Sequence, residues 1–252
     1  VSRSRALLVY ECLDIHHLMT RRDLVGRAMR AIERRLIKAS ERVIVSSPGF
    51  IREYFDVHHR NHYRASIIEN RLPPGSVPEG RPAPGRIKSD GEPIVIGWFG
   101  NLRCLRSMHL LRSLAQRLPD QVQVVLYGVP SLVDIPDFDS QVRDLPNLVY
   151  RGRYRYPNDL ADIYGQLDLI WAGDFHDANF NSRWLLPNRV YEGGYFGVPP
   201  VAPADSETGR WVESRSSGWL VDDPLDDSLF RLVTSLTHEE IHRQRCELLS
   251  LD

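Results

Sequence analysis

Hydrophobic positions along the chain alternate between short uninterrupted runs and longer stretches with an apolar residue every three or four positions. Short runs bounded by polar residues or glycine predict strands buried in a sheet. They occur at residues 6–10, 42–46, 65–68, 94–99, 122–127, 148–150, 169–171, 200–202 and 219–221. The helical spacing occurs at residues 18–42, 47–55, 108–118, 158–167, 187–196 and from 226 onward. This alternation predicts an α/β fold with mostly parallel sheets covered on both faces.

A stretch rich in proline and glycine divides this pattern. Residues 72–93 have no apolar period, so we expect a linker or long loop there. Residues 94–252 then form one domain, and residues 1–71 form the C-terminal part of another. Only three predicted strands precede the linker, so we expect the first domain to be incomplete in this chain.

Composition excludes several classes of protein. The 252 residues are 42% hydrophobic and 26% charged, which is typical of a globular core rather than of disorder. A formal net charge of −1 gives no global field that would attract nucleic acid. Cys12, Cys104 and Cys246 lie far apart, which favours a reducing, cytoplasmic setting over a disulfide framework. The sequence has no apolar run near the roughly 18 residues that a membrane helix needs.

The most informative motif spans residues 186–202, Leu-Pro-Asn-Arg-Val-Tyr-Glu-Gly-Gly-Tyr-Phe-Gly-Val-Pro-Pro-Val-Ala. Pro187 suits the start of a helix. Glu192 lies one turn beyond Asn188, on the same helix face. A carboxylate there can accept two hydrogen bonds from a ribose diol, while the helix N-terminus offers N–H groups to a diphosphate. From spacing alone, the competing interpretation is a solvated glutamate on a surface helix.

This motif resembles the nucleotide-sugar segment of the GT-B glycosyltransferases, most closely the group 1 (family 4-like) enzymes. Weaker resemblances follow in the same order over nearly the whole chain. They lie at residues 40–47, 67–70, 96–100, 146–152, 159–164, 167–170 and 218–221. The resemblance implies two Rossmann-like domains and a metal-independent transfer of a sugar from a nucleoside-diphosphate-sugar to a hydroxyl group. It implies a glycan or lipid-linked acceptor and no cofactor, because the nucleotide-sugar is a substrate.

The resemblance also assigns donor-binding roles. Glu192 would hold the ribose, and arginines after a glycine-led loop would stabilise the charge of the leaving diphosphate. The donor-binding residues expected on this basis are Gly100, Asn101, Arg103, Arg106, Arg153, Asn188 and Glu192. The competing interpretation of the arginines is that they are surface residues at a helix start.

One position departs from the family pattern. Trp184 stands eight positions before Glu192, where the family often has a glutamate that contacts the sugar. We expect this contact either to be absent or to be made by Asn181, Ser182 or Asp177 instead. The departure leaves open an alternative function, a degenerate glycosyltransferase-like domain that binds nucleotide or glycan without catalysis. A nucleotide-dependent oxidoreductase would need a Gly-x-Gly-x-x-Gly turn after a strand, and the sequence has none.

Candidate catalytic residues follow the first predicted strand, in the segment Glu-Cys-Leu-Asp-Ile-His-His at residues 11–17. An inverting transferase needs a carboxylate or histidine to take the proton of the acceptor hydroxyl. Glu11, Asp14 and His16 are the candidates. The competing interpretation is a helix-capping Asp14 beside exposed histidines.

The helical stretch at residues 18–42 is strongly basic. Eight basic residues against three acidic ones give it a net charge of +5. A basic amphipathic helix favours anionic lipid surfaces, so peripheral membrane contact is one expectation. The other is a solvated basic face whose apolar side packs on the sheet.

Two motifs have more ordinary explanations than metal binding. His238 and His242 match a zinc-protease pattern, but Thr237 and Glu240 predict a capping box at the start of a helix. The pair Asp137 and Asp139 matches the metal-binding carboxylates of a different glycosyltransferase fold, but it falls in a predicted loop.

Overall fold

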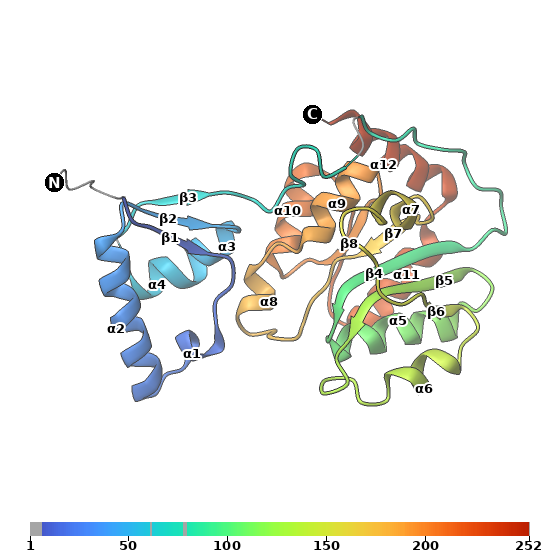
Figure 1. Cartoon of the computed structure of the whole chain (residues 1–252). Helices are drawn as coiled ribbons and strands as arrows, with labels where there is room; N and C mark the ends of the chain where they lie inside the picture. Colours follow the sequence, from blue (N-terminus) through green and yellow to red (C-terminus); the bar gives the residue numbers. More distant parts are fainter. Residues whose placement is uncertain (1–6, 61, 78–79, 252) are drawn as a thin grey trace. The chain divides into compact units, whose positions relative to one another are not determined.

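The computed structural model describes residues 7–60, 62–77 and 80–251 and contains two compact units. The first unit comprises residues 1–70 and 177–186, and the second comprises residues 71–176 and 187–252. Each unit has its own parallel sheet, drawn in blue to cyan for the first and from green to orange for the second (Figure 1).

The first unit contains a three-stranded sheet in the order β1-β2-β3. Its strands are β1 (Val9–Cys12), β2 (Arg42–Val45) and β3 (Ala65–Ile67). Its helices are α1 (His17–Thr20), α2 (Leu24–Ala39), α3 (Pro48–Phe50), the π-helical turn Ile51–Phe55, α4 (Asp56–His58) and α8 (Asn181–Trp184). The strand expected at residues 6–10 begins later, and Ala6 lies outside the described residues.

The predicted helix at residues 18–42 is two helices rather than one. The side chain of Asp23 accepts a hydrogen bond from the backbone N–H of Gly26 and so caps a new helix, α2. The chain also passes very close to itself there, since a Cβ on Gly26 would lie 2.2 Å from the backbone oxygen of Arg21. A single continuous helix therefore does not form.

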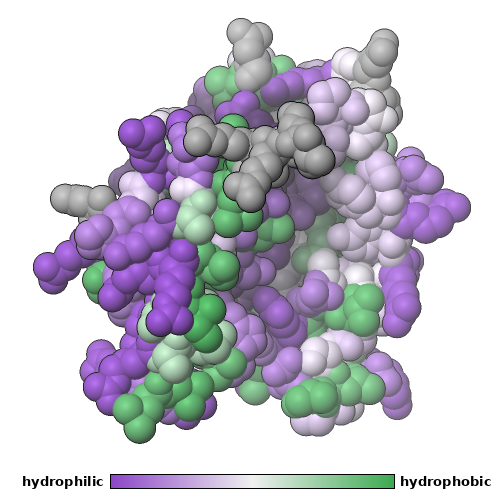
Figure 2. All heavy atoms as spheres, turned by 60° about the vertical axis from the view of Figure 1, so that its left-hand side comes forward, coloured by the Kyte–Doolittle hydropathy of each residue, from purple (hydrophilic) through white to green (hydrophobic). Residues whose placement is uncertain are grey.

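The inner face of α2 differs from the apolar face that the spacing predicts. Leu24 and Ile32 are 73% and 52% exposed, whereas Glu33 is only 2% exposed. Glu33 turns inward because it accepts hydrogen bonds from Tyr10, Tyr54 and His59, residues distant in sequence. The expectation that the apolar side of this helix packs on the sheet is confirmed for Ile37, which is buried with Val43 and Val45 of β2, and is wrong for Leu24 and Ile32. Figure 2 shows apolar side chains standing among hydrophilic ones on the molecular surface.

The segment 177–186 belongs to the first unit, although the sequence places it within the predicted domain 94–252. Phe180 and Trp184 pack in the core around Phe50. The hydroxyl of Ser47 donates to the backbone oxygen of Trp184. Packing of these two aromatic rings on the core of the first unit explains why this segment leaves the unit that contains its chain neighbours.

The second unit contains a six-stranded parallel sheet in the order β6-β5-β4-β7-β8-β9. Its strands are β4 (Ile94–Leu102), β5 (Val122–Pro130), β6 (Leu148–Tyr150), β7 (Leu169–Trp171), β8 (Pro200–Pro203) and β9 (Trp219–Val221). Its helices are α5 (Leu105–Arg117), α6 (Phe138–Arg143), α7 (Leu160–Tyr164), α9 (Asn188–Phe196), α10 (Glu207–Arg215), α11 (Leu225–Ser235) and α12 (His238–Ser250). This is the doubly wound order of a Rossmann-like sheet, which reverses between β4 and β7.

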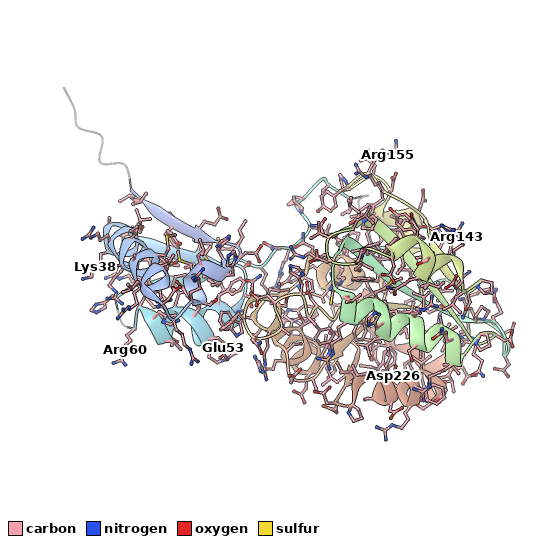
Figure 3. The ribbon with its side chains drawn as sticks, turned by 90° about the horizontal axis from the view of Figure 1, so that it is seen from below. Lys38, Glu53, Arg60, Arg143, Arg155 and Asp226 are labelled. Carbon is pink, nitrogen blue, oxygen red and sulfur yellow. The ribbon has the colours of Figure 1, made fainter. Side chains whose placement is uncertain are left out.

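Apolar residues on both faces hold this sheet between its helices. Trp98 and Trp171 lie fully buried in one cluster, and Tyr164 and Ile170 lie in the other. Ion pairs add contacts between the helices, such as that between Arg117 of α5 and Asp226 of α11. Asp226 is labelled in Figure 3. Both layers fix the carboxyl ends of β4 and β7, where ligands bind in such sheets.

The carboxyl ends of β4 and β5 approach each other unusually closely. Gly128 has φ +130°, and a Cβ there would lie 1.9 Å from the backbone oxygen of Gly100. Only glycine fits at this position, so the loops after these strands start from a fixed spacing.

Two local predictions have clear outcomes. The capping box between Thr237 and Glu240 is confirmed, with both reciprocal hydrogen bonds present. Asp137 lies in the predicted loop, whereas Asp139 lies in α6, which begins at Phe138, a residue fully buried in the core.

Candidate donor and acceptor sites

The carboxyl edge of the second unit's sheet collects several of the expected donor-binding residues. Gly100 and Asn101 lie at the end of β4, and Arg103 and Arg106 follow directly. Glu192 lies on α9, the helix that leads from β7 to β8. These elements border the point at which the strand order reverses.

Glu192 is a buried carboxylate with a single hydrogen bond from the described residues. It is 5% exposed, and the hydroxyl of Tyr164 donates to its Oε2 at 2.7 Å. Burial raises the pKa of Glu192, and the Tyr164 hydrogen bond and the charge of Arg189 oppose that shift only in part. The remaining acceptor positions of this carboxylate are therefore under-used.

Arg189 occupies the same helix face, three residues before Glu192. Its Nε donates to the backbone oxygen of Trp171 at 2.9 Å, and its Nη2 donates to that of Gly173 at 3.0 Å. The guanidinium therefore lies at the carboxyl end of β7. It also brings a fixed positive charge close to Glu192.

The start of α9 is open to an anion. Its N-cap residue is Pro187, which has no side-chain acceptor for the first backbone N–H groups. Asn188, the first residue of the helix, is exposed. An uncapped helix N-terminus favours a phosphate group through these N–H donors and the helix dipole.

The other expected arginines differ in how they are held. Arg106 pairs with Asp223 at 3.1 Å and lies 4.6 Å from the centre of the Phe175 ring. Arg103 is half-buried and Arg153 is exposed, and neither side chain makes a hydrogen bond or ion pair with the rest of the described chain. Arg103 could therefore bind a ligand without breaking an existing contact, whereas Arg106 would first have to break its ion pair with Asp223.

Asn181 and Ser182 belong to the first unit, whereas Glu192 belongs to the second. The amide of Asn181 is committed at both ends, since its Oδ1 accepts from the Ile15 N–H at 2.8 Å and its Nδ2 donates to Asp14 at 2.9 Å. The Ser182 hydroxyl accepts from the Asp177 N–H at 2.9 Å. Both side chains thus have hydrogen-bond partners within the first unit, and their contact with the donor sugar stays a prediction.

The candidate catalytic residues gather around the carboxyl end of β1 in the first unit. Glu11 is an exposed residue within β1 itself. Asp14 is exposed, with Oδ1 held by Asn181. His16 caps α1, because its Nδ1 accepts from the Leu18 N–H at 3.3 Å. A neutral imidazole that accepts at Nδ1 carries its proton on Nε2, so it has no second lone pair to act as a base.

Arg189 and Tyr164 are the functional candidates that the sequence analysis missed. The signal for Arg189 was available, because it lies three positions before Glu192 within the same motif. Tyr164 gave no such signal, since it lies 28 residues upstream on a different helix. Only folding brings its hydroxyl to the carboxylate.

His238 and His242, which match the zinc-protease pattern, have structural partners. His238 Nε2 lies 2.8 Å from the backbone oxygen of Glu92, and His242 Nε2 lies 3.6 Å from Cys246 Sγ. Within the described ranges, no three His, Cys, Asp or Glu side chains are grouped so as to hold a metal ion. Among the same residues, no helix is long and apolar enough to cross a membrane.

Comparison with known proteins places these features in context. No family model matches the chain. It is 41% identical over 232 residues to the succinoglycan biosynthesis protein ExoL of Rhizobium meliloti (strain 1021), an alignment that covers 91% of this chain and 58% of ExoL. The chain thus spans somewhat more than half the length of this relative.

Solved glycosyltransferase structures share the fold. The match to WaaG, a glycosyltransferase involved in lipopolysaccharide biosynthesis, covers 98% of this chain and 72% of the WaaG chain, with a TM-score of 0.61 and 15% identity. The match to HepE of Anabaena, solved in complex with UDP, covers 97% of this chain and 68% of the HepE chain, with a TM-score of 0.67 and 17% identity. The predicted α/β architecture is confirmed, and the chain has the fold of the GT-B glycosyltransferases.

Proposed function

We propose that this protein is a glycosyltransferase that moves a sugar from a nucleoside-diphosphate-sugar to a hydroxyl group in polysaccharide biosynthesis. The observation that carries the proposal is Glu192, a buried carboxylate with unused acceptor positions at the switch point of a Rossmann-like sheet. The similarity to ExoL supports the process, and the UDP complex of HepE supports the class of donor.

The donor would be held by three kinds of contact. The carboxylate of Glu192 would accept hydrogen bonds from the two ribose hydroxyls, with Tyr164 fixing its orientation. The open N-terminus of α9 would bind a phosphate. Arg103 would add a guanidinium that stabilises the charge growing on the leaving diphosphate as the bond to the sugar breaks. The loop at Gly100 and Asn101 would contact the donor through its backbone groups, and Arg153 would contact the donor near its base.

Asp14 is the best candidate to take the proton of the acceptor hydroxyl. Asn181 holds one of its carboxylate oxygens, and the residue as a whole is exposed, so the other oxygen is available. A carboxylate within hydrogen-bond reach of a hydroxyl can act as its general base. His16 is the weaker candidate because its Nδ1 lone pair already caps α1.

The proposal is tested first by calorimetry with UDP. We expect Glu192→Gln to weaken UDP binding about a hundredfold, because two hydrogen bonds to a charged group are weakened in a buried site. Glu240→Gln is the matched control, since Glu240 is also a glutamate on a helix of the second unit but serves a capping box. Unchanged UDP affinity in Glu192→Gln would remove the ribose assignment. Binding of UDP without release of sugar from any nucleotide-sugar would instead indicate a non-catalytic binding protein.

We also propose that α2 contacts an anionic membrane surface. The large apolar residues exposed on this helix are Leu24, Val25, Ile32 and Leu36. Basic side chains such as Arg34 and Lys38, the latter labelled in Figure 3, are exposed on the same helix. Apolar insertion and attraction to anionic headgroups act together in such helices.

The protein should co-sediment with phosphatidylglycerol vesicles and not with phosphatidylcholine vesicles, and Ile32→Glu should reduce the bound fraction. Equal binding to both vesicle types would contradict the proposal.

A further inference from the structure

Asn181 connects two segments of the first unit that are far apart in sequence. It is 9% exposed and is the first residue of α8. Its Oδ1 accepts from the Ile15 N–H and its Nδ2 donates to Asp14, across 166 and 167 positions of the chain. One side-chain amide thus fixes both the backbone and the carboxylate of the loop after β1.

Both partners of this contact are themselves held in place. On the α8 side, Trp184 is 8% exposed in the core, and its backbone oxygen accepts from the Ser47 hydroxyl. On the β1 side, Ile15 is buried, and the Ser46 hydroxyl donates to the Leu13 oxygen at 3.3 Å. The amide therefore joins two segments that each have contacts of their own within the first unit.

The contact leaves a usable carboxylate. Asn181 donates to Asp14 Oδ1 alone, and the Asp14 carboxylate has no other hydrogen bond or ion pair with the described residues. Donation to one oxygen orients the carboxyl group, and it leaves Oδ2 free to accept a proton. A structural cap would instead use the carboxylate for backbone N–H groups of its own helix, and α1 is capped by His16.

We propose that Asn181 is a positioning residue for the general base Asp14. This inference rests on the proposed function. In the proposed step, Asp14 Oδ2 takes the proton of the acceptor hydroxyl while the oxygen of that hydroxyl forms a bond to the anomeric carbon of the donor sugar. The bond from that carbon to the diphosphate oxygen breaks, and its electron pair leaves with the nucleoside diphosphate. Asn181 keeps the accepting oxygen in place and does not itself contact the reacting atoms.

The chain also connects this residue to the donor-binding elements. The segment 177–186 follows β7, whose carboxyl end binds Arg189, and it leads directly into α9, which carries Glu192. A residue that fixes the base therefore lies on the same stretch of chain as the residues proposed to hold the nucleotide.

The test uses two substitutions that separate the two hydrogen bonds. Asn181→Asp keeps an oxygen for the Ile15 N–H but loses the donor to Asp14, and Asn181→Leu loses both. We expect each to lower kcat for release of UDP from UDP-sugars at least about tenfold, since a misplaced catalytic group costs up to about a hundredfold. UDP affinity, measured by calorimetry, should stay within about twofold of the wild type, because only a transition-state contact is altered.

Asn147→Leu is the matched control. Asn147 is a comparable linking residue in the second unit, where its Nδ2 donates to the backbone oxygens of Ala115 and Val122. It should lower thermal stability while leaving kcat near that of the wild type. A merely structural role for Asn181 would give the same result as this control.

Two outcomes distinguish the inference from the function on which it rests. If Asp14→Asn abolishes turnover while both Asn181 variants keep kcat within about twofold of the wild type, the positioning role is overturned and the function stands. If the wild-type protein releases UDP from no member of a panel of UDP-, GDP- and ADP-sugars, the proposed function is overturned and the inference is overturned with it.

Discussion

Glu33 and Glu192 are both buried glutamates on helices, and their surroundings have opposite effects. Burial raises the pKa of Glu33, but hydrogen bonds from His59, Tyr54 and Tyr10 outweigh that effect and leave it lowered. Burial also raises the pKa of Glu192, and one hydrogen bond from Tyr164 does not reverse the shift. The first carboxylate is fully used by the protein, whereas the second retains acceptor positions.

The difference separates a structural carboxylate from one suited to a ligand. A carboxylate that receives three donors is stabilised in its charged form and holds its helix in place. A buried carboxylate with one donor costs stability when charged, and a ribose diol could supply the missing donors. Three predictions test whether this contrast holds.

The largest expected effect comes from Glu33→Ala. Removing this carboxylate leaves Tyr10, Tyr54 and His59 without their buried acceptor, so the first unit should lose about 3 kcal/mol or more of stability. Amide hydrogen exchange should accelerate in β1 to β3 and much less in β4 to β9. Glu41→Ala, at an exposed position after α2, is the control. Equal acceleration in both sheets would contradict a local structural role.

A smaller effect of opposite sign is expected from Glu192→Gln. Because the folded-state pKa of Glu192 is raised above its ordinary 4.5, the wild type loses stability as the pH rises past that value. The neutral amide avoids this loss, so the variant should melt at a higher temperature at pH 7. The advantage should shrink toward pH 4, where both side chains are uncharged. A melting temperature at pH 7 below that of the wild type would show that the carboxylate is structural, as Glu33 is.

The smallest effect is expected from Tyr164→Phe. The ring keeps its stacking on Phe196, with centroids 5.2 Å apart, and only the hydroxyl that orients Glu192 is lost. One hydrogen bond contributes about 1 kcal/mol, so UDP affinity should fall about fivefold. Calorimetry with UDP measures this directly. A loss as large as that in Glu192→Gln would mean that Tyr164 itself contacts the nucleotide.

Local pattern predicted the strands well and the partners of buried polar groups poorly. Uninterrupted apolar runs such as residues 94–99 and 169–171 became strands because each is buried on both faces of a parallel sheet. The inner face of α2 was mispredicted because Glu33 finds its partners in residues 54 and 59, which no helical period reveals. Tertiary hydrogen bonding decided that orientation against hydrophobicity.

The candidate site shows the same limit. The motif around Glu192 could be found because its residues are consecutive, and the positions of Gly100 and Arg103 followed from strand ends. The commitment of Asn181 to Asp14 depends on a segment that changes unit, and its sequence carries no periodic signal for that change. The roles of these residues remain predictions for the experiments above.

Because residues 177–186 belong to the first unit, they affect how the protein folds during its synthesis. During synthesis the ribosome releases residues 7–70 long before the aromatic rings of Phe180 and Trp184, which complete the core of the first unit. That core stays open while more than a hundred further residues emerge, including four strands of the second sheet, β4 to β7, that can pair on their own. Nascent chains stalled before residue 177 should therefore bind chaperones through the unfinished first unit, and chains stalled well beyond residue 186 should not.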